Sequence, residues 1–259
     1  MTTQAKQWHL QCAADEIGRY VFLPGDPARS KVIADHFDES WKVAENREMV
    51  TYTGTVKGTK VSVTSTGMGA ASTAIAVEEL IRLGADTFIR IGSGGGMQKD
   101  ILPGDLVIAT GAVRDEGVSQ FLVPIEYPAV ASHDVVSALI AACKKNKSRH
   151  HVGIFQSKAL FYGQQRDRDK VPTYEWVESR WQAWLRANVI ASEMEAAMIF
   201  TLASVRGKRS GCIATVGSNT ENPAAGRKVL AEKGGFDEVI EAAVEAVRIL
   251  AEWDKAVSE

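Results

Sequence analysis

Short apolar runs alternate with amphipathic helical patterns along almost the whole chain. Runs with strand character lie at residues 20–23, 60–64, 87–91, 106–110, 151–155, 189–191 and 211–216, and helical patterns at 27–37, 72–83, 134–145, 192–205 and 237–253. This alternation is typical of α/β folds, in which helices cover a largely buried sheet. No low-complexity linker and no internal repeat divides the sequence. We therefore expect a single domain over residues 1–259, a three-layer α/β/α sandwich around a mixed central β-sheet.

Composition argues against several classes of function. Hydrophobic residues make up 45% of the 259 residues, which is enough for a substantial core. The 30 Lys and Arg nearly balance the 32 Asp and Glu, so no basic surplus favours nucleic acid or an anionic membrane as a partner. Scattered cysteines (Cys12, Cys143 and Cys212) indicate neither a disulfide framework nor a zinc site. Residues 1–18 lack the apolar core of a signal peptide, and we expect a cytoplasmic protein.

An arginine stands at an unusual place after the first expected strand. Asp26 and Pro27 are a natural N-cap and first residue of the helix that begins there. Arg29 follows in the first turn, where the helix dipole disfavours a cation unless an anion lies between them. The segment is therefore compatible with an ordinary helix start and with a phosphate site that includes Arg29.

A second arginine interrupts the apolar run at 87–91. If Arg90 is buried, its guanidinium needs an internal carboxylate or a bound anion as its partner. Ser93 and three glycines, 94–96, follow it. Such a run can be a plain tight turn, or it can let backbone N–H groups approach a ligand while Ser93 adds a hydroxyl. Arg90, Ser93 and these amides are a candidate oxyanion cradle.

Residues 192–195 read Ser-Glu-Met-Glu at an expected strand-to-helix turn. Ser192 and Glu195 have the spacing of a capping box, which would make Glu195 a helix cap. The turn also lies beyond a strand end, where ligands of α/β folds usually bind, and a carboxylate there can grip sugar hydroxyls. The sequence alone favours the cap and leaves the ligand contact open.

Residues 158–170, KALFYGQQRDRDK, combine two aromatic side chains with Gln164, Gln165 and Arg166. Most charged runs of this kind are solvated loops. A glutamine amide and an arginine can nevertheless pair with the acceptors and donor of a lactam while an aromatic ring stacks on its face, as reading a uracil ring requires. The wider stretch 164–186, rich in charge and tryptophan, is expected to be an irregular insertion or lid rather than core.

Taken together, these motifs resemble the nucleoside phosphorylase family of hexameric enzymes, and most closely its uridine-cleaving branch. The match follows the family's order through LPGDPAR, NREMVTYTG, STGMGAASTAIAVEEL, FIRIGSGGGMQ, GDLVIATGAVRDEG, YPAVA, FYGQQR and ASEMEAA. The resemblance implies a nucleoside phosphorylase-like fold and a pentosyltransferase of nucleoside salvage. Its favoured reaction is uridine plus phosphate to uracil plus ribose 1-phosphate. It also implies a homo-hexamer built as a trimer of dimers.

The resemblance further implies roles for individual residues. Phosphate, the co-substrate, would be held by Gly25, Arg29, Arg90 and Ser93, with Arg47 supplied across a dimer interface. Ribose would contact Met194 and Glu195, and His9 of the neighbouring subunit. The base would contact Gly95, Phe161, Gln164 and Arg166. Catalysis would depend on Glu195, Arg90 and Arg29, no organic cofactor is implied, and K⁺ is a candidate ligand of Glu48 and Ser72 at the dimer interface.

Two departures from the uridine branch leave the base open. The loop after Tyr162 is one residue short, so an ungapped alignment would shift the role of Gln164 to Gln165. In addition, the uridine branch often carries Asn-Arg where this chain reads Ser218-Asn219-Thr220, so an arginine of that branch is missing. The purine branch has an aspartate at about the position of Asn219 that protonates the leaving base, which an asparagine cannot do. The alternatives are a 6-oxopurine nucleoside phosphorylase and a nucleosidase or nucleoside-binding relative. A nicotinamide enzyme is a weaker alternative, because the near-matches to the dinucleotide fingerprint at Gly67 and Gly92 lack its last glycine.

Overall fold

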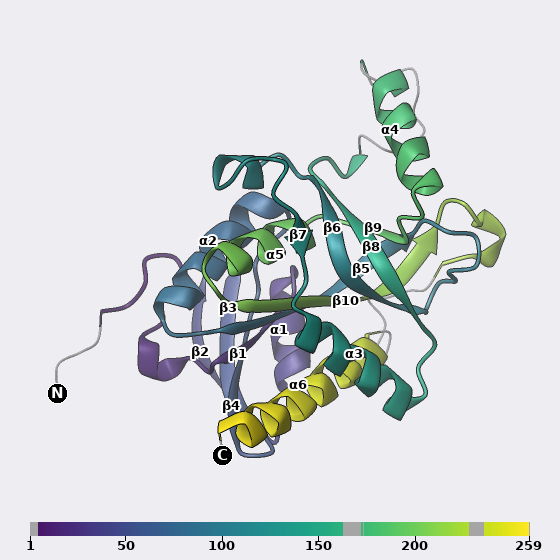
Figure 1. The fold of residues 1–259 in the computed structure, drawn as a ribbon. Coiled ribbons are helices and arrows are strands. Elements are labelled where there is room, and N and C mark those ends of the chain that lie inside the picture. The colour runs from purple at the N-terminus through teal and green to yellow at the C-terminus, as the bar shows by residue number, and fades with distance from the viewer. Residues whose placement is uncertain (1–4, 163–171, 173, 228–235, 259) are drawn as a thin grey trace.

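The computed structural model describes residues 5–162, 172, 174–227 and 236–258. The strands are β1 (Tyr20–Leu23), β2 (Glu39–Asn46), β3 (Met49–Val56), β4 (Thr59–Thr64), β5 (Thr87–Gly96), β6 (Leu106–Asp115), β7 (Ala129–Val130), β8 (His150–Lys158), β9 (Ala191–Glu193) and β10 (Arg209–Asn219). The α-helices are α1 (Pro27–Ala34), α2 (Ala70–Arg82), α3 (His133–Asn146), α4 (Tyr174–Arg186), α5 (Ala196–Val205) and α6 (Asp237–Ser258). Figure 1 shows their arrangement.

The strands form one mixed sheet, part of which closes on itself. The strand order is β10-β6-β8-β9-β5-β1-β4-β3-β2, and β7 pairs with β6. Because β10 also pairs with β5, the strands β10, β6, β8, β9 and β5 form a closed ring from which the other strands extend. The α/β fold with a mixed sheet is thereby confirmed. The closure of the ring was not predicted from the sequence. It brings the ends of β5, β9 and β10 to one place.

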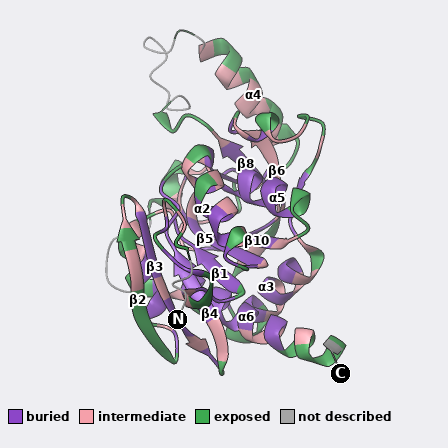
Figure 2. Ribbon diagram, turned by 90° about the vertical axis from the view of Figure 1, so that its left-hand side faces the viewer, coloured by how far each residue is buried: buried purple, intermediate pink, exposed green. Residues whose placement is uncertain are grey.

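Helices cover both faces of this sheet. In Figure 1, α2 and α5 lie together on one side of β10, and α3 and α6 lie on the other. The α5 sequence is apolar on nearly every side and residues 196–203 are all buried, as expected for a helix inside a core. In Figure 2 the central strands are buried, whereas α4 is exposed or intermediate along its length.

Two regions differ from the sequence prediction. Residues 174–186 form the regular helix α4, so the expectation of an irregular stretch is wrong for these residues. The expectation that they lie outside the core holds, because α4 has no buried residue. The hairpin of β2 and β3 was not predicted as strands. The first four residues of β2 are all exposed, so its sequence lacks the apolar alternation that marks a half-buried strand.

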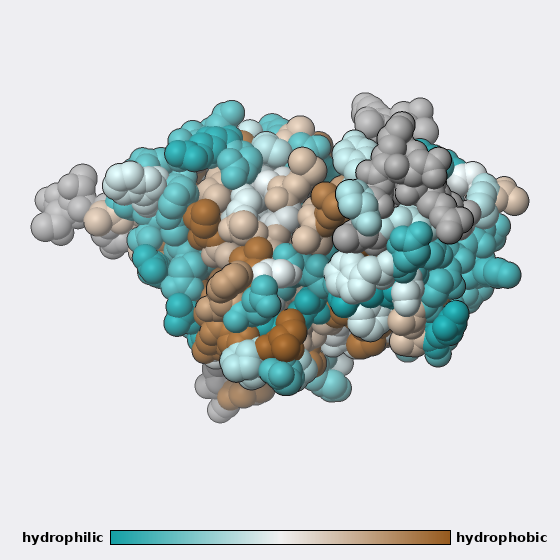
Figure 3. Space-filling model, turned by 90° about the horizontal axis from the view of Figure 1, so that it is seen from above, coloured by the Kyte–Doolittle hydropathy of each residue, from teal (hydrophilic) through white to brown (hydrophobic). Residues whose placement is uncertain are grey.

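The surface is mixed in character. Seen from above in Figure 3, hydrophilic residues dominate, and hydrophobic residues gather toward the lower middle of this face. Among the described residues, no helix has the length and apolar character needed to cross a membrane.

Candidate active site

The candidate site lies where β1, β5 and β9 end. β1 and β5 are parallel, with Leu23 beside Arg90, so the turn that carries Gly25 begins next to Arg90. β9 lies antiparallel across the last residues of β5, with Ser192 beside Gly95. The segments after β1 and β9 therefore meet alongside the second half of β5, beyond the end of β1, and ligands of α/β folds bind beyond strand ends.

Arg90 is the centre of this edge. It is only 5% exposed. Its Nε donates to Glu193 Oε2 at 2.7 Å, and its Nη2 pairs with Glu195 Oε2. Burial lowers the pKa of Arg90, but the Glu195 and Glu193 carboxylates outweigh this effect, and the net shift is upward. The internal carboxylate partner considered from the sequence is thus present, and in fact there are two such partners.

One donor of Arg90 is still available. Its Nη1 is buried and has no hydrogen-bond partner among the described residues. Buried donors in native proteins are nearly always paired, so a donor without a protein partner can serve a bound anion. Gly92 makes room for the guanidinium, because a Cβ at this position would lie 2.9 Å from Arg90 Nη2. The glycines after Arg90 belong to β5 and do not form a tight turn.

Glu193 holds the start of α5. It is buried, and its carboxylate accepts the N–H of Glu195 at 2.8 Å and the N–H of Ala196 at 3.0 and 3.1 Å. The Ser157 hydroxyl also donates to it. The capping box predicted for Ser192 and Glu195 is therefore wrong. β9 continues through Glu193 and α5 begins only at Ala196, so Glu195 is at the N-cap position, and the side chain that accepts the N–H groups there is that of Glu193.

Glu195 has different partners. It is 3% exposed, and its Oε1 accepts the N–H of Gly69 at 2.6 Å while Oε2 pairs with Arg90. Burial raises the pKa of Glu195, and the charge of Arg90 opposes that shift. The side chain makes no capping hydrogen bond at α5. Its carboxylate is held between the Arg90 guanidinium and the loop before α2.

Arg29 brings a second cation to this edge. Asp26 accepts the N–H of Ala28 at 2.9 Å, which confirms the predicted N-cap. The guanidinium carbon of Arg29 lies 4.1 Å from the ring centroid of Phe236. Burial lowers the pKa of Arg29, and the charge of Arg90 adds to this effect while Asp26 opposes it. Arg29 and Arg90 therefore lie within electrostatic reach, and an anion between them would relieve their repulsion.

The loop between β4 and α2 brings the two candidate cation ligands together. Gly67 has a φ of +71°, and a Cβ there would lie 2.7 Å from Glu48 Cγ. Ser72 Oγ lies 2.8 Å from Glu48 Oε1. The backbone of Glu48 and the Ser72 hydroxyl lower the pKa of Glu48, so its carboxylate is available as an ionised oxygen ligand.

His9 and Arg47 lie on the surface beside Glu48. The Asn46 side chain donates to the carbonyl of His9 at 2.7 Å, and Arg47 occupies the turn between β2 and β3. Both residues lower the pKa of Glu48 electrostatically. Within the described chain, neither forms a hydrogen bond or ion pair with Arg90 or Glu195. We refer to His9, Arg47 and Glu48 as the surface cluster, and to Arg90, Glu193 and Glu195 as the buried cluster.

The structure describes only part of the predicted base site. Gly95 is the last residue but one of β5, and Met194 lies half-buried between the two glutamates. Phe161 is 53% exposed, with Tyr162 edge-on at a centroid distance of 5.1 Å. Lys158 Nζ, which sequence reasoning missed, lies 5.0 Å from the Phe161 centroid. Gln164, Gln165 and Arg166 lie outside the described residues.

Ser93 follows Arg90 by three residues on β5 and is half-buried. Side chains at this spacing leave opposite faces of a regular strand. Ser93 is therefore brought to the same edge as Arg90, but its side chain does not start from the same face of the sheet.

Asn219, at the end of β10, is committed to the backbone. Its Nδ2 donates to the carbonyls of Gln98 at 2.7 Å and Ile101 at 2.8 Å, and its Oδ1 accepts the N–H of Glu221 at 2.8 Å. Both donors of the amide are thus used to hold the loop after β5. A carboxylate at this position would face two carbonyl oxygens, which disfavours an ionised aspartate here.

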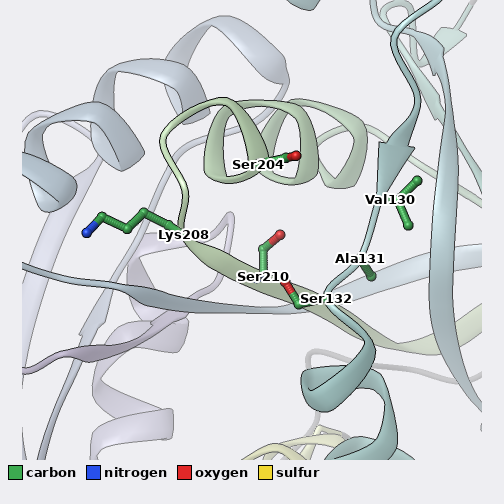
Figure 4. Close-up of a pocket in the computed structure, with 6 residues that line it drawn as sticks. All are labelled: Val130, Ala131, Ser132, Ser204, Lys208 and Ser210. Carbon is green, nitrogen blue, oxygen red and sulfur yellow. Dashed lines mark hydrogen bonds between the residues drawn. The ribbon is translucent and has the colours of Figure 1, made fainter.

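A cavity of about 290 Å³ lies elsewhere, at the amino end of β10, and is lined by Val130, Ala131, Ser132, Ser204, Lys208 and Ser210. Figure 4 shows that the Lys208 side chain points away from the other lining residues. The cavity thus gathers hydroxyl groups without a charged side chain facing it. It lies at the opposite end of β10 from Asn219 and has no part in the clusters described above.

Comparisons with known proteins identify the family of this chain. Residues 19–252 match the sequence profile of the phosphorylase superfamily. The uridine phosphorylase of Treponema pallidum (strain Nichols) is 48% identical over 248 residues, which cover 96% of this chain and 95% of that protein. The uridine phosphorylase of Thermococcus kodakarensis is 45% identical over 255 residues, covering 98% of this chain and 90% of that protein. The guanosine phosphorylase of Halorubrum lacusprofundi is 41% identical over 215 residues, covering 83% of this chain and 84% of that protein.

The chain therefore belongs to the phosphorylase superfamily. It is a uridine phosphorylase-like nucleoside phosphorylase, that is, a pentosyltransferase whose substrates are a nucleoside and phosphate.

Proposed function

We propose that this chain converts uridine and inorganic phosphate to uracil and ribose 1-phosphate, with Arg90 and Arg29 holding the phosphate. The observation that carries the phosphate site is the buried Nη1 of Arg90, which has no protein partner among the described residues. The charge of Arg90 also lowers the pKa of Arg29, so a second guanidinium lies within electrostatic reach. Gly25 and Ser93 complete the proposed phosphate site, and Arg47 enters it from a neighbouring subunit. The uridine substrate is supported by the two uridine phosphorylases above.

The proposed chemistry is a displacement at the sugar. A phosphate oxygen forms a bond to C1′ as the bond from C1′ to the base nitrogen breaks, and the electron pair of that bond leaves with the base. Positive charge develops on the ribose, where the buried carboxylate of Glu195 can stabilise it and hold the sugar hydroxyls. Met194 lies beside Glu195, Gly95 and Phe161 face the base, and Gln164 with Arg166 would receive the anionic pyrimidine. The residues position and stabilise, with no covalent intermediate.

Assembly and ion binding belong to the same proposal. His9 and Arg47 lie apart from the buried cluster, so a dimer that places them at a neighbour's site is needed, and a trimer of such dimers gives the hexamer. Large apolar side chains near them are exposed, among them Trp8 at 78% and Met68 at 83%, as expected for a face that another subunit covers. K⁺ would bind Glu48 and Ser72 at that interface. A cytoplasmic location remains a prediction from the sequence.

One experiment separates the candidates. Base release from uridine, thymidine, inosine, guanosine and adenosine is followed with phosphate, with arsenate and in phosphate-free buffer. We expect fast release from uridine only with phosphate or arsenate. Equal rates without phosphate would replace the phosphorylase with a nucleosidase, and no turnover of any nucleoside would indicate a binding protein. A preference for inosine or guanosine would favour the 6-oxopurine alternative, which the guanosine phosphorylase relative supports.

A further inference from the structure

A single carboxylate fastens the N-terminal segment to α2. Glu79 lies on α2 and is 6% exposed. Its Oε2 accepts the backbone N–H of Leu10 at 2.8 Å and that of His9 at 3.0 Å. Its Oε1 lies 2.6 Å from Nδ1 of the His9 ring. Three donor positions from two consecutive residues therefore converge on one buried side chain.

We infer that Glu79 is a positioning residue, which fixes the ring orientation and tautomer of His9 so that Nε2 is presented as a hydrogen-bond acceptor for a sugar hydroxyl. The inference rests on the proposed function, in which His9 contacts the ribose in a neighbouring subunit. It adds a residue from α2 that reaches the ribose only through His9.

The protonation state of the pair follows from the environment of the carboxylate. Burial raises the pKa of Glu79, but hydrogen bonds from Leu10 and His9 outweigh it, and the net shift is downward. At neutral pH the carboxylate is therefore ionised and can only accept. The 2.6 Å contact then requires the proton on His9 Nδ1. In the neutral ring this leaves Nε2 without a proton, as an acceptor.

The ring contact goes beyond what anchoring the segment requires. Two backbone N–H bonds to Glu79 already hold His9 and Leu10, and Asn46 donates to the His9 carbonyl at 2.7 Å. The His9 side chain is still 31% exposed, whereas that of Glu79 is 8% exposed. The Nδ1 edge faces the carboxylate, and we place the opposite edge, with Nε2, toward the ligand. A buried carboxylate behind an accessible histidine is the arrangement by which proteins orient functional imidazoles.

Glu79→Gln separates the anchoring of the N-terminal segment from the control of the His9 tautomer. The amide oxygen of glutamine can still accept from the backbone N–H groups, so the segment stays anchored. The amide NH₂ then faces Nδ1 as a donor, which makes Nδ1 an acceptor and moves the ring proton to Nε2. The adjacent Glu78 offers a matched control, because it lies on the same helix but pairs with Arg82 and Arg206 at the surface.

The first measurement is the tautomer, read from ¹⁵N NMR of histidine-labelled protein and assigned by the signal lost in His9→Ala. We expect an Nδ1–H ring in the wild type and an Nε2–H ring in Glu79→Gln. An Nε2–H ring in the wild type would overturn the inference. This measurement needs no substrate and no stable Glu79 variant, so it stands even if the proposed function fails.

The second measurement is kinetic. We expect kcat/KM for uridine to fall roughly tenfold in Glu79→Gln, mainly through KM, and to stay within about twofold in Glu78→Gln. If Glu79 acts through His9, the double variant His9→Ala/Glu79→Gln is no worse than His9→Ala alone. Additive losses would assign Glu79 to the packing of α2 and overturn the inference. A wild type that cleaves no nucleoside counts against the proposed function, and the tautomer decides the inference separately.

Discussion

The buried cluster and the surface cluster are held in opposite ways. Arg90, Glu193 and Glu195 are each at most 5% exposed, and each has its partners within one chain. In the surface cluster, Arg47 is exposed and the His9 side chain is 31% exposed, although Glu79 and Asn46 fix its position. The sheet therefore holds together the buried half of the proposed site, whereas the proposal takes His9 and Arg47 from another subunit.

This difference separates stability from activity. A buried charge that loses all its partners is costly, so a substitution in the buried cluster that strands such a charge affects both folding and catalysis. Exposed charges contribute little to stability, so substitutions in the surface cluster affect catalysis alone. The following substitutions test that division.

Removal of the central guanidinium has the largest expected effect. Arg90→Met leaves Glu193 and Glu195 buried without their cation, which costs ~3–5 kcal/mol of stability. It also removes the proposed phosphate donor, and kcat/KM falls by ~10³ or more. Chemical denaturation measures the first effect, and phosphorolysis by the folded fraction measures the second. Arg90→Lys, which keeps a charge, is the control for folding. Unchanged stability in Arg90→Met would mean that the cluster is not held together by this residue.

Glu195→Gln tests the charge at the proposed ribose contact. Its amide oxygen can keep the Gly69 hydrogen bond, and Glu193 still pairs with Arg90, so we expect a stability change below ~1 kcal/mol. If the carboxylate stabilises cationic ribose, kcat/KM falls by ~10², which corresponds to ~2.7 kcal/mol. Steady-state kinetics and thermal unfolding give both numbers. A variant within about threefold of the wild-type kcat/KM would remove Glu195 from the chemistry.

Arg47→Ala tests the proposed contribution of a second chain. Loss of one charge-assisted hydrogen bond to phosphate lowers kcat/KM for phosphate ~10-fold or more, with an unchanged melting temperature because Arg47 is exposed. Subunits with Arg47→Ala are then mixed and reassembled with Glu195→Gln subunits. If each site takes Arg47 from one chain and Glu195 from the other, one of the two sites in each hybrid dimer is intact. Random mixing makes about half of the dimers hybrids, so activity rises to about a quarter of wild type. No recovery in verified hybrids would place Arg47 at the site of its own chain.

The strands and helices around the buried cluster could be predicted from the sequence, but the ion pairs between their side chains could not. The strand at 87–91 and the helix start at Asp26 and Pro27 follow from local patterns. The partnership of Arg90 with both Glu193 and Glu195 does not, because it depends on the pairing of β9 with β5 and β8, residues that lie far apart in the chain. The same limit explains the wrong capping box. The Ser192 to Glu195 spacing is local, whereas the pairing of residues 191–193 into β9 is not.

The surface cluster was predictable only through the resemblance. The β2 and β3 hairpin that carries Arg47 and Glu48 has an exposed, charged first strand, so its sequence has no strand periodicity. Glu79 gave no signal either, because it lies among the residues of a regular amphipathic helix. Only the structure reveals that it faces inward and receives the N-terminal segment, through hydrogen bonds between residues about 70 positions apart.

The smallest expected effect is the pH dependence of the link between Glu79 and the surface cluster. The folded pKa of Glu79 lies below its ordinary value, chiefly because N–H donors outweigh burial. The unfolded carboxyl, with a pKa of about 4.3, takes up a proton at higher pH than the folded one, so acid favours the unfolded state. The stabilisation from the ionised Glu79 carboxylate is fully present above the unfolded pKa and is lost as pH falls through the folded pKa.

We expect wild type to exceed Glu79→Gln in stability by ~1 kcal/mol at neutral pH, with the difference shrinking below about pH 4. Denaturation of both proteins from pH 7 down to pH 3 measures it, with Glu78→Gln as the control. A difference that stays constant over this range would mean that the ionised carboxylate does not hold the segment, and the surface cluster would then need another anchor.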